Sequence, residues 1–412
     1  MRALDRGDQK VAITADLNSV PVASPVSTAS RRQVILCLAL AVLLFRTFLT
    51  FVTPQLWAED GLIYAIAYNS GWHALLSPLA GTFNVFGAAV ALLAANLPPI
   101  LAPWIEVYAA HAAALLIVWM VMSPRFDMPH KELAALGVVC APGGFEVLGF
   151  LINTQWILPL GLFVLAFSSP SRTKAIVALE AIFVAIVGLD GPVGLFFVPV
   201  FLLLTFSEQG GARGRLAVLS IVLLMSAALQ ISLLYADHSI LDIVKPQRYP
   251  ASLWFTLPGR WLDATWPLSA LFGFDRRYIF PVAVMIVLAI WFSLREPYRK
   301  QKLAMLFIAA AILLSGMYKF RHALDNVADQ NGRYFYAGSV FLYWFLCIAA
   351  ETFPRMRNTI LAVTAITLLN GAWFMVLRTY PPVPWTTASA QIGHGPVSIP
   401  ISPAGWSIDL NH

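Results

Sequence analysis

Long apolar runs recur along most of this 412-residue chain, and they restrict its fold more than any other feature. A helix needs about 20 apolar residues to cross the hydrocarbon core of a bilayer, whereas a membrane β-barrel alternates in segments of about ten. Charged residues make up only 12% of the chain, against about 25% in soluble domains. We therefore predict an all-α, polytopic transmembrane helical bundle of about 11 spans, near residues 33–53, 103–122, 132–150, 155–168, 174–189, 190–206, 216–236, 279–294, 303–319, 338–351 and 359–377.

The segments between these runs predict the orientation of the chain. Short segments rich in Lys and Arg favour the cytoplasmic side, and they read RR, SPRFDMPHK, SRTK, GARGR, REPYRKQK and PRMRN. The net charge of +6 then reports topology and gives no reason to expect nucleic acid as a partner. This assignment places the N-terminus inside and the C-terminus outside, and the terse loops are typical of a bacterial inner (cytoplasmic) membrane.

The same assignment divides the chain into three parts. Residues 1–32 are polar and predict a disordered cytoplasmic tail, and residues 33–377 form a transmembrane domain. Its first outer loop, 54–102, holds amphipathic material, and its long outer loop covers 237–278. Segment 83–97 is apolar but ends at two prolines, so it either spans the membrane or is re-entrant. The outer tail, 378–412, alternates around a Pro-Ala-Gly turn and favours a β-hairpin.

Two adjacent acids, Glu59 and Asp60, follow the first apolar run in the stretch PQLWAEDG. One interpretation is that an acid caps the helix that begins near Leu62, where the helix dipole favours negative charge. The other is that one of them acts as a general base, because a carboxylate near the apolar boundary becomes more basic. Gly61 lets a substrate or another backbone approach closely.

A group of cations lies in a later outer segment, around NGRYFYAG. A guanidinium binds phosphate oxygens in a bidentate manner, so Arg333 is a candidate phosphate ligand. Arg321 and Lys319 lie nearby in the sequence and serve the same purpose. The flanking Tyr334 and Tyr336 are either an interfacial aromatic belt or substrate contacts.

Further polar and aromatic residues outside the spans are candidate substrate ligands. Asn153 and Gln155 can donate to sugar hydroxyls or phosphate, and Trp156 can stack on a sugar ring, although simple interfacial hydrogen bonding is equally consistent with the sequence. The other candidates are Trp57 beside the two acids and Arg260 in the long outer loop. Asp190, at the break LDGP, is expected to cap the helix that follows it.

Ionisable groups inside the runs are expected to pair with one another. We expect Arg46 to pair with an acid, and Glu180, Glu106 and His111 are the other such groups. The three cysteines lie in apolar runs and predict neither a disulfide framework nor a metal site. No P-loop, dinucleotide-binding or zinc-protease motif occurs, so we expect no nucleotide cofactor; a divalent metal stays open.

These features resemble the GT-C superfamily of integral-membrane glycosyltransferases. The resemblance rests on Glu59–Asp60–Gly61 directly after the first span, on the surface material up to about residue 97, and on the many spans. NTQW, GRYFY and PISPAGW also resemble segments of an uncharacterised bacterial branch of inner-membrane proteins. GT-C enzymes carry a catalytic acid in the first outer loop and use polyprenyl-phosphate sugars as donors. The short C-terminal tail departs from the large outer domain of many members.

The resemblance implies a glycosyltransferase that acts at the non-cytoplasmic face. Asp60 or Glu59 would be the general base, and the cations around Arg333 would bind the donor phosphate. The partners would be a polyprenyl-phosphate sugar, membrane lipid and a glycan or glycolipid acceptor. Two alternatives remain, namely a flippase or transporter of a lipid-linked sugar, and a polysaccharide polymerase or ligase. The sequence does not predict the sugar, the acceptor or the oligomeric state.

Overall fold

The structure is a computed structural model that describes residues 25–79, 81–142, 144, 147–171, 173–236, 279–320, 333–374, 383 and 385–411. It is almost entirely helical, with one short hairpin near the C-terminus. The α-helices are α1 Pro25–Arg46, α2 Phe48–Val52, α3 Ala58–Ser70, α4 Val85–Ala95, α5 Ala102–Val121, α6 Lys131–Cys140, α7 Thr154–Ile157, α8 Pro159–Ala166, α9 Lys174–Gly188, α10 Val198–Ser207, α11 Gly210–Ala236, α15 Ile279–Ser293, α16 Arg299–Phe320, α17 Arg333–Thr352, α18 Arg357–Phe374 and α19 Trp385–Ser389. The 3₁₀ helices are η1 Gly71–Leu76, η2 Pro99–Leu101 and η3 Pro192–Phe197, and the strands are β1 Val397–Ile401 and β2 Trp406–Leu410.

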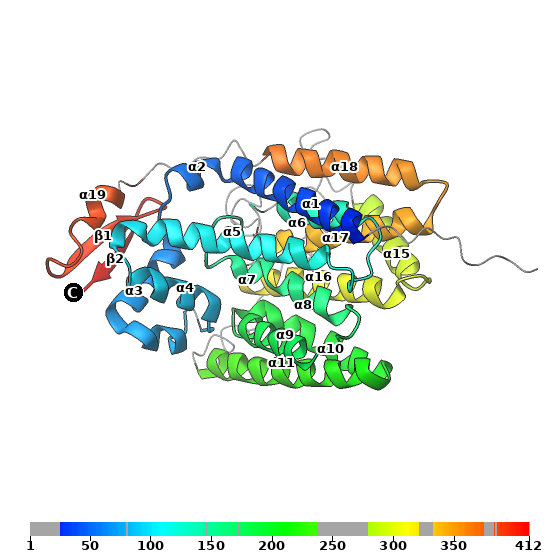
Figure 1. The fold of residues 1–412 in the computed structure, drawn as a ribbon, viewed down its shortest axis with the longest axis horizontal. Helices are drawn as coiled ribbons and strands as arrows, with labels where there is room; N and C mark the ends of the chain where they lie inside the picture. Colours follow the sequence, from blue (N-terminus) through cyan, green and yellow to red (C-terminus); the bar gives the residue numbers. More distant parts are fainter. Residues whose placement is uncertain are drawn as a thin grey trace, which may run out of the picture.

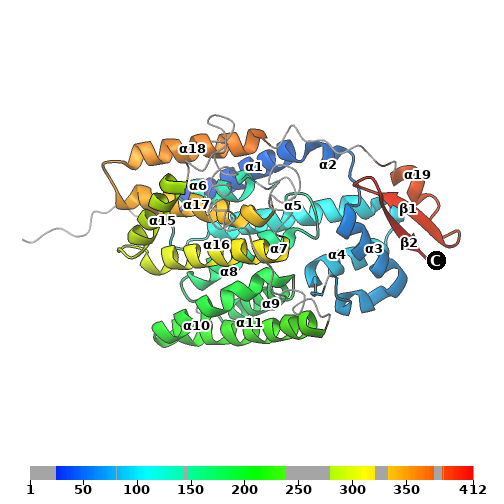
Figure 2. The ribbon, with the colours of Figure 1, turned by 180° about the vertical axis from the view of Figure 1, so that it is seen from behind.

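The long helices lie side by side as a bundle, and a smaller structure is attached at one end. In Figures 1 and 2, α1, α5, α11, α16 and α18 run along the long axis of the molecule. The shorter helices α3, α4 and α19 gather with the hairpin around the start of α5. The residues 54–102 and 383–411, which are far apart in the sequence, therefore form one structure at the same end, which we call the end domain.

The bundle is that of a helical membrane protein. Among the described helices, the segments Pro99–Val121, Gly210–Ala236 and Arg333–Thr352 are long and apolar enough to cross a bilayer. Large apolar side chains also point outward from several helices, including Leu203, Phe206 and Leu369, which are 69%, 74% and 71% exposed. Water disfavours such a surface, whereas lipid does not. The number of spans and their orientation stay predictions.

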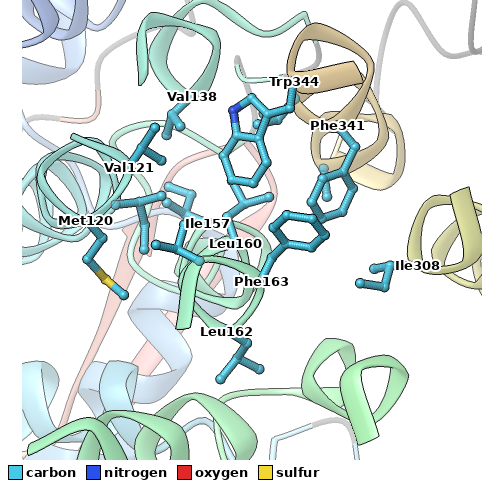
Figure 3. Packing of buried hydrophobic residues seen from close by; sticks show 14 of the residues in the cluster. Met120, Val121, Val138, Ile157, Leu160, Leu162, Phe163, Ile308, Phe341 and Trp344 are labelled. Atoms are coloured by element: carbon cyan, nitrogen blue, oxygen red, sulfur yellow. The ribbon is translucent and has the colours of Figure 1, made fainter. Parts of the chain in front are cut away.

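The centre of the bundle is an apolar core built on aromatic rings. Figure 3 shows Phe163 of α8 facing Phe341 and Trp344 of α17, with ring centroids 5.2 and 5.4 Å away. Edge-to-face and tilted pairs of this kind contribute about 0.5–1.5 kcal/mol each beyond burial. The Trp344 indole N–H donates to the carbonyl of Ala134 on α6 at 2.8 Å. The core thus joins α6, α8 and α17.

Two of the predicted spans are interrupted by helix-breaking residues. The run 132–150 does not form one helix, because α6 ends at Cys140. Pro142 excludes Ala141 from the helical region, and Ala141 has ψ of 135°. The residues after α6 turn back into the protein, where Val147, Leu148 and Leu151 are buried. The first run is also broken, at Thr47 between α1 and α2.

Segment 83–97 contains α4, which has 11 residues. At 1.5 Å per residue it is about 16 Å long, which is about half the thickness of a hydrocarbon core. It lies in the end domain beside α3 (Figure 1). As a single helix it is therefore too short to span, and the re-entrant or surface alternative fits its length.

The buried ionisable groups pair differently from what the sequence predicts. Arg46 pairs with no acid among the described residues; its guanidinium donates to the carbonyls of Val139 and, at 3.0 Å, Ala141. These carbonyls lie at the C-terminal end of α6, where helix carbonyls have no partner in their own helix. The expectation of an Arg46–acid pair is therefore wrong in this part of the chain.

A buried acid, Glu180, forms ion pairs with two arginines other than Arg46. Its carboxylate lies 2.7 Å from Arg125 and 2.6 Å from Arg215. Arg215 also donates to the carbonyl of Leu165 at 3.0 Å. The two arginines come from segments that the sequence assigns to the cytoplasmic side, and the contacts hold those segments together.

The basic segments meet at the end of the bundle opposite the end domain. Arg125 donates to the carbonyl of Ser169 at 2.9 Å, and Gln301 donates to the carbonyl of Asp127 at 2.9 Å. Lys300 pairs with Glu208 at 2.6 Å. The molecule therefore has one basic end with short connections and one elaborated end.

The chain closes with an antiparallel hairpin that is built into the end domain. Ile399 of β1 faces Ile408 of β2 in the ladder, and both side chains are buried. They join an apolar cluster with Tyr64 of α3 and Trp385 of α19. The hairpin that the sequence predicts around the Pro-Ala-Gly turn is thus present, and it packs into the end domain.

Candidate active site

The two acids Glu59 and Asp60 lie in the first turn of α3. The helix begins at Ala58, four residues before the predicted start near Leu62. The Ala58 amide donates to the carbonyl of Ser402 at 2.5 Å, and the Ser402 amide donates to the carbonyl of Leu56 at 3.1 Å. The residues just after β1 therefore hold the start of the helix, and the helix dipole favours both carboxylates there.

Asp60 is buried, with 3% of its surface exposed. Its carboxylate oxygens accept from the backbone N–H groups of Leu151 and Ile152, at 3.1 and 2.5 Å. Burial is the largest effect on the pKa of the Asp60 carboxyl and raises it, and the charge of Glu59 acts in the same direction, whereas the two N–H groups lower it. The net pKa is about 7. Asp60 is thus an anchor for residues 147–153, which we call the inner loop.

Glu59 points to a different neighbour and is accessible. A Glu59 carboxylate oxygen lies 3.9 Å from a guanidinium nitrogen of Arg333, the first residue of α17. The side chains of Glu59 and Arg333 are 31% and 24% exposed. The separation exceeds a hydrogen bond, so the two charges attract each other without being locked together. The structure therefore brings the predicted acid and the predicted phosphate ligand to one place.

An aromatic ring lies beside Arg333, and other rings pack near it in the structure. The guanidinium of Arg333 lies 5.6 Å from the centre of the Tyr334 ring, and Tyr334 meets Trp156 edge-to-face with ring centroids 5.0 Å apart. The ring centroid of Trp57, two residues before Glu59, lies 4.8 Å from that of Phe150. Trp156 is buried, and its indole N–H has no hydrogen-bond partner among the described residues. The site thus combines a carboxylate, a guanidinium and apolar rings.

The NTQW segment continues directly from the inner loop. Asn153 is buried at the start of α7. Gln155 lies against the break at Gly191, where a Cβ atom would be 2.0 Å from its side-chain oxygen. Gly191 also has φ of 80°, which favours glycine. Gln155 therefore contacts another backbone, and its role as a substrate ligand stays a prediction.

Asp190 caps a different helix from the one expected. It is fully buried, and one carboxylate oxygen accepts from the amide of Phe86 in the first turn of α4, at 3.1 Å. Thr154 lies 3.4 Å from the other oxygen. The prediction that Asp190 caps the following helix is therefore wrong. Asp190 instead joins the end domain to α7.

The remaining predicted ligands lie elsewhere or outside the described residues. Tyr336 is fully buried and donates to the carbonyl of Val138 on α6 at 2.7 Å, so it serves the bundle core. Arg260 and Arg321 lie outside the described residues. Lys319 lies in α16, and its side chain is among those not described. Their roles stay predictions.

The space beside Gly61 is filled by side chains of the hairpin and is not open to a substrate. A Cβ atom there would lie 2.4 Å from Cδ1 of Ile401 and 3.2 Å from Cγ2 of Ile408. The sequence analysis anticipated close approach at Gly61 but did not name the partner. No local pattern connects residue 61 with residues 401 and 408, so sequence reasoning had no signal for it.

No group of three or more His, Cys, Asp or Glu side chains that could hold a metal ion occurs among the described residues. The adjacent acids diverge, since Asp60 turns inward to the inner loop and Glu59 turns to Arg333. Whether a metal assists the chemistry stays open.

Comparison with known proteins assigns no family. No protein-family model and no curated protein matches the chain. One solved structure with some similarity is the archaeal oligosaccharyltransferase AglB from Archaeoglobus fulgidus, in complex with an inhibitory peptide and a dolichol-phosphate. The TM-score is 0.46 and the sequence identity 15%, over 86% of this chain and 56% of that one. The chain thus spans little more than half the length of that protein, and a likeness of this size does not establish a shared fold or activity.

Proposed function

We propose that the protein is a membrane glycosyltransferase of the GT-C type, which moves a sugar from a polyprenyl-phosphate donor to an acceptor. The observation that carries this proposal is the meeting of Glu59 and Arg333, from α3 and α17, with 3.9 Å between their charged atoms. Both are accessible, and both lie at the end of an apolar bundle. A carboxylate and a phosphate-binding cation beside a lipid phase are the groups that this reaction needs.

Glu59 is the general base in this proposal, because it is accessible whereas both oxygens of Asp60 accept backbone N–H groups. The Glu59 carboxylate takes the proton of an acceptor hydroxyl. The hydroxyl oxygen attacks the anomeric carbon, and the bond from that carbon to the phosphate oxygen breaks. The polyprenyl phosphate leaves with the electron pair, and the anomeric centre inverts.

Arg333 is the ligand for the donor phosphate. Guanidinium binds phosphate oxygens through paired hydrogen bonds, and it stabilises the charge that develops on the leaving group. The loose pair with Glu59 keeps the guanidinium near the reacting centre without saturating its donors. The polyprenyl chain would lie along the apolar helices, and the acceptor would be a glycan or glycolipid.

The reaction would take place at the non-cytoplasmic face. The basic segments that favour the cytoplasm meet at one end of the bundle, and α3, whose first turn carries Glu59 beside Arg333, lies toward the other (Figure 1). The positive-inside rule then places the end domain outside. In this orientation, a donor in the outer leaflet presents its phosphate at the depth of the site.

The test is transfer from a defined donor in liposomes. Purified protein is reconstituted with a short-chain polyprenyl-phosphate sugar, and release of polyprenyl phosphate is measured together with labelling of an acceptor. We expect release by the wild type and a loss of about 10²-fold or more in Glu59→Gln, as for removal of a general base. Lys300→Ala is the matched control, because it removes an exposed charge at the basic end.

Other outcomes identify the alternatives. If no sugar transfer is seen but the donor crosses the bilayer equally in wild type and Glu59→Gln, the protein is a flippase or transporter of lipid-linked sugar. If only a long glycan is transferred, as an assembled chain, the polymerase or ligase alternative holds. Release that persists unchanged in both Glu59→Gln and Asp60→Asn would exclude the carboxylates as the base.

A further inference from the structure

The ion pair of Glu59 and Arg333 is open, in contrast to the buried pair of Glu180 and Arg215. Arg215 donates a hydrogen bond to Glu180 at 2.6 Å, whereas 3.9 Å separates the charged atoms of Arg333 and Glu59. Within the described part of the chain, neither the Glu59 carboxylate nor the Arg333 guanidinium makes a hydrogen bond. The acceptors of one and the donors of the other are therefore available to a ligand.

The backbones that carry this pair are held in place. Ala58 and Asp60, the residues before and after Glu59, are both hydrogen-bonded to other segments of the chain. On α17, Tyr336 donates to α6 at 2.7 Å, less than one turn after Arg333. Both charged side chains are partly exposed, at 31% and 24%. The pair can therefore open by a change of rotamer, without movement of either helix.

A phosphate would compete with Glu59 for the guanidinium. An exposed ion pair contributes little to stability, whereas a phosphate binds a guanidinium through paired, charge-assisted hydrogen bonds. The carboxylate and the phosphate are both anions, so each disfavours the other beside the same cation. Arg333 therefore gains more from a phosphate than it loses with Glu59.

We propose that Arg333 changes its partner when the donor binds, leaving Glu59 and binding the phosphate of the lipid-linked sugar. A carboxylate beside an anion accepts a proton more readily than one beside a cation. Proton transfer from the acceptor hydroxyl to Glu59 therefore depends on prior binding of the donor. This dependence rests on the proposed function, whereas the competition between Glu59 and a phosphate for Arg333 does not.

Equilibrium binding of a short-chain polyprenyl phosphate to the purified full-length protein in nanodiscs tests the competition. Glu59→Gln removes the competing charge, so we expect it to bind this lipid about 3- to 10-fold more tightly than the wild type. Glu208→Gln is the matched control, because it removes another exposed, paired acid at the basic end; its affinity should equal that of the wild type. Unchanged or weaker binding in Glu59→Gln overturns the proposal, as does a failure of both wild type and Glu59→Gln to bind the lipid.

A double variant tests whether the effect acts through Arg333. Arg333→Gln, or Arg333→Met if the glutamine variant does not fold, should weaken binding about tenfold or more. In that background, Glu59→Gln should change the affinity by less than about twofold, because no cation remains to compete for. If the full tightening persists without Arg333, Glu59 only repels the phosphate and the exchange of partners is excluded. The neutral polyprenol of the same length should not respond to Glu59→Gln; an equal response excludes the phosphate as the competing group.

These binding measurements need no sugar transfer, so the two hypotheses fail separately. If the wild type transfers no sugar but Glu59→Gln binds polyprenyl phosphate more tightly through Arg333, the proposed function fails and the exchange of partners stands. If sugar is transferred but the affinity of Glu59→Gln is unchanged, the proposed function stands and the exchange of partners fails.

Discussion

Gly61 offers the sharpest test of how the end domain holds the acids, because one methyl group lies much closer to it than any other atom of the hairpin. A Cβ atom at Gly61 would lie 2.4 Å from Cδ1 of Ile401, whereas carbon atoms in contact are about 3.5–4.0 Å apart. In Gly61→Ala, Cδ1 of Ile401 must therefore move by more than 1 Å, either by a change of its side-chain rotamer or by a shift of the hairpin. Overpacking of this kind costs about 1–3 kcal/mol.

A second substitution removes the same obstacle. Ile401→Val deletes Cδ1, and alone it should cost about 0.5–1.5 kcal/mol. In the double variant the nearest atoms to the new Cβ are Cγ2 of Ile408 at 3.2 Å and Cγ1 of residue 401 at 3.6 Å, which need only a small adjustment. The double variant should thus be more stable than the sum of the single effects by about 1–2 kcal/mol.

The assay is unfolding of the detergent-purified variants, followed by helical circular dichroism and by Trp fluorescence. Gly211→Ala is the matched control, because Gly211 lies in α11 and a Cβ atom there has no neighbour within 4 Å; it should be neutral or stabilising. If Gly61→Ala is as stable as the wild type, or if the double variant shows purely additive losses, the hairpin does not hold the first turn of α3 as described.

Three further predictions follow from buried polar groups. Burial raises the pKa of Asp60 to about 7 from an ordinary value near 3.8. The folded state therefore binds more protons than the unfolded state between these two pH values, and stability should fall as the pH rises through them. In Asp60→Asn, the thermal unfolding temperature should depend less on pH over the same range. Glu180→Gln leaves the buried Arg215 and the partly exposed Arg125 without their acid and should cost about 3–5 kcal/mol. Lys300→Ala at an exposed pair should cost less than about 1 kcal/mol in the same unfolding assay. Tyr336→Phe removes a buried hydrogen bond to Val138 and should cost about 1–3 kcal/mol of stability with the KM for the lipid donor unchanged; a raised KM at full stability would instead place Tyr336 in the substrate site.

The apolar runs determine the class of fold because each must be removed from water along its whole length. A run of about 20 apolar residues satisfies its own backbone only as a helix in lipid, and no distant contact is needed for that result. Residues that break helices act just as locally. Pro142 follows α6 and ends it, but continuous hydropathy hid this break in the predicted span 132–150.

The candidate site was only partly accessible from the sequence. Glu59 and Arg333 stood out because charged residues are conspicuous in an apolar chain, and the hypothesis that they share one place is matched by their 3.9 Å separation. Their chemical roles stay predictions. The division of labour between Glu59 and Asp60 was not readable, because adjacent residues on a helix point in different directions and only the neighbours decide which one is buried.

The amino-acid pattern by itself thus determined a helical membrane protein with most of its acids and cations outside the apolar runs. Only the tertiary structure decided that Asp60 binds the backbone of residues 151 and 152 and that Gly61 lies against Ile401. The physical reason is that the hydropathy of a run depends only on its own residues, whereas these contacts join segments far apart in the chain. They exist only once the bundle has brought those segments together.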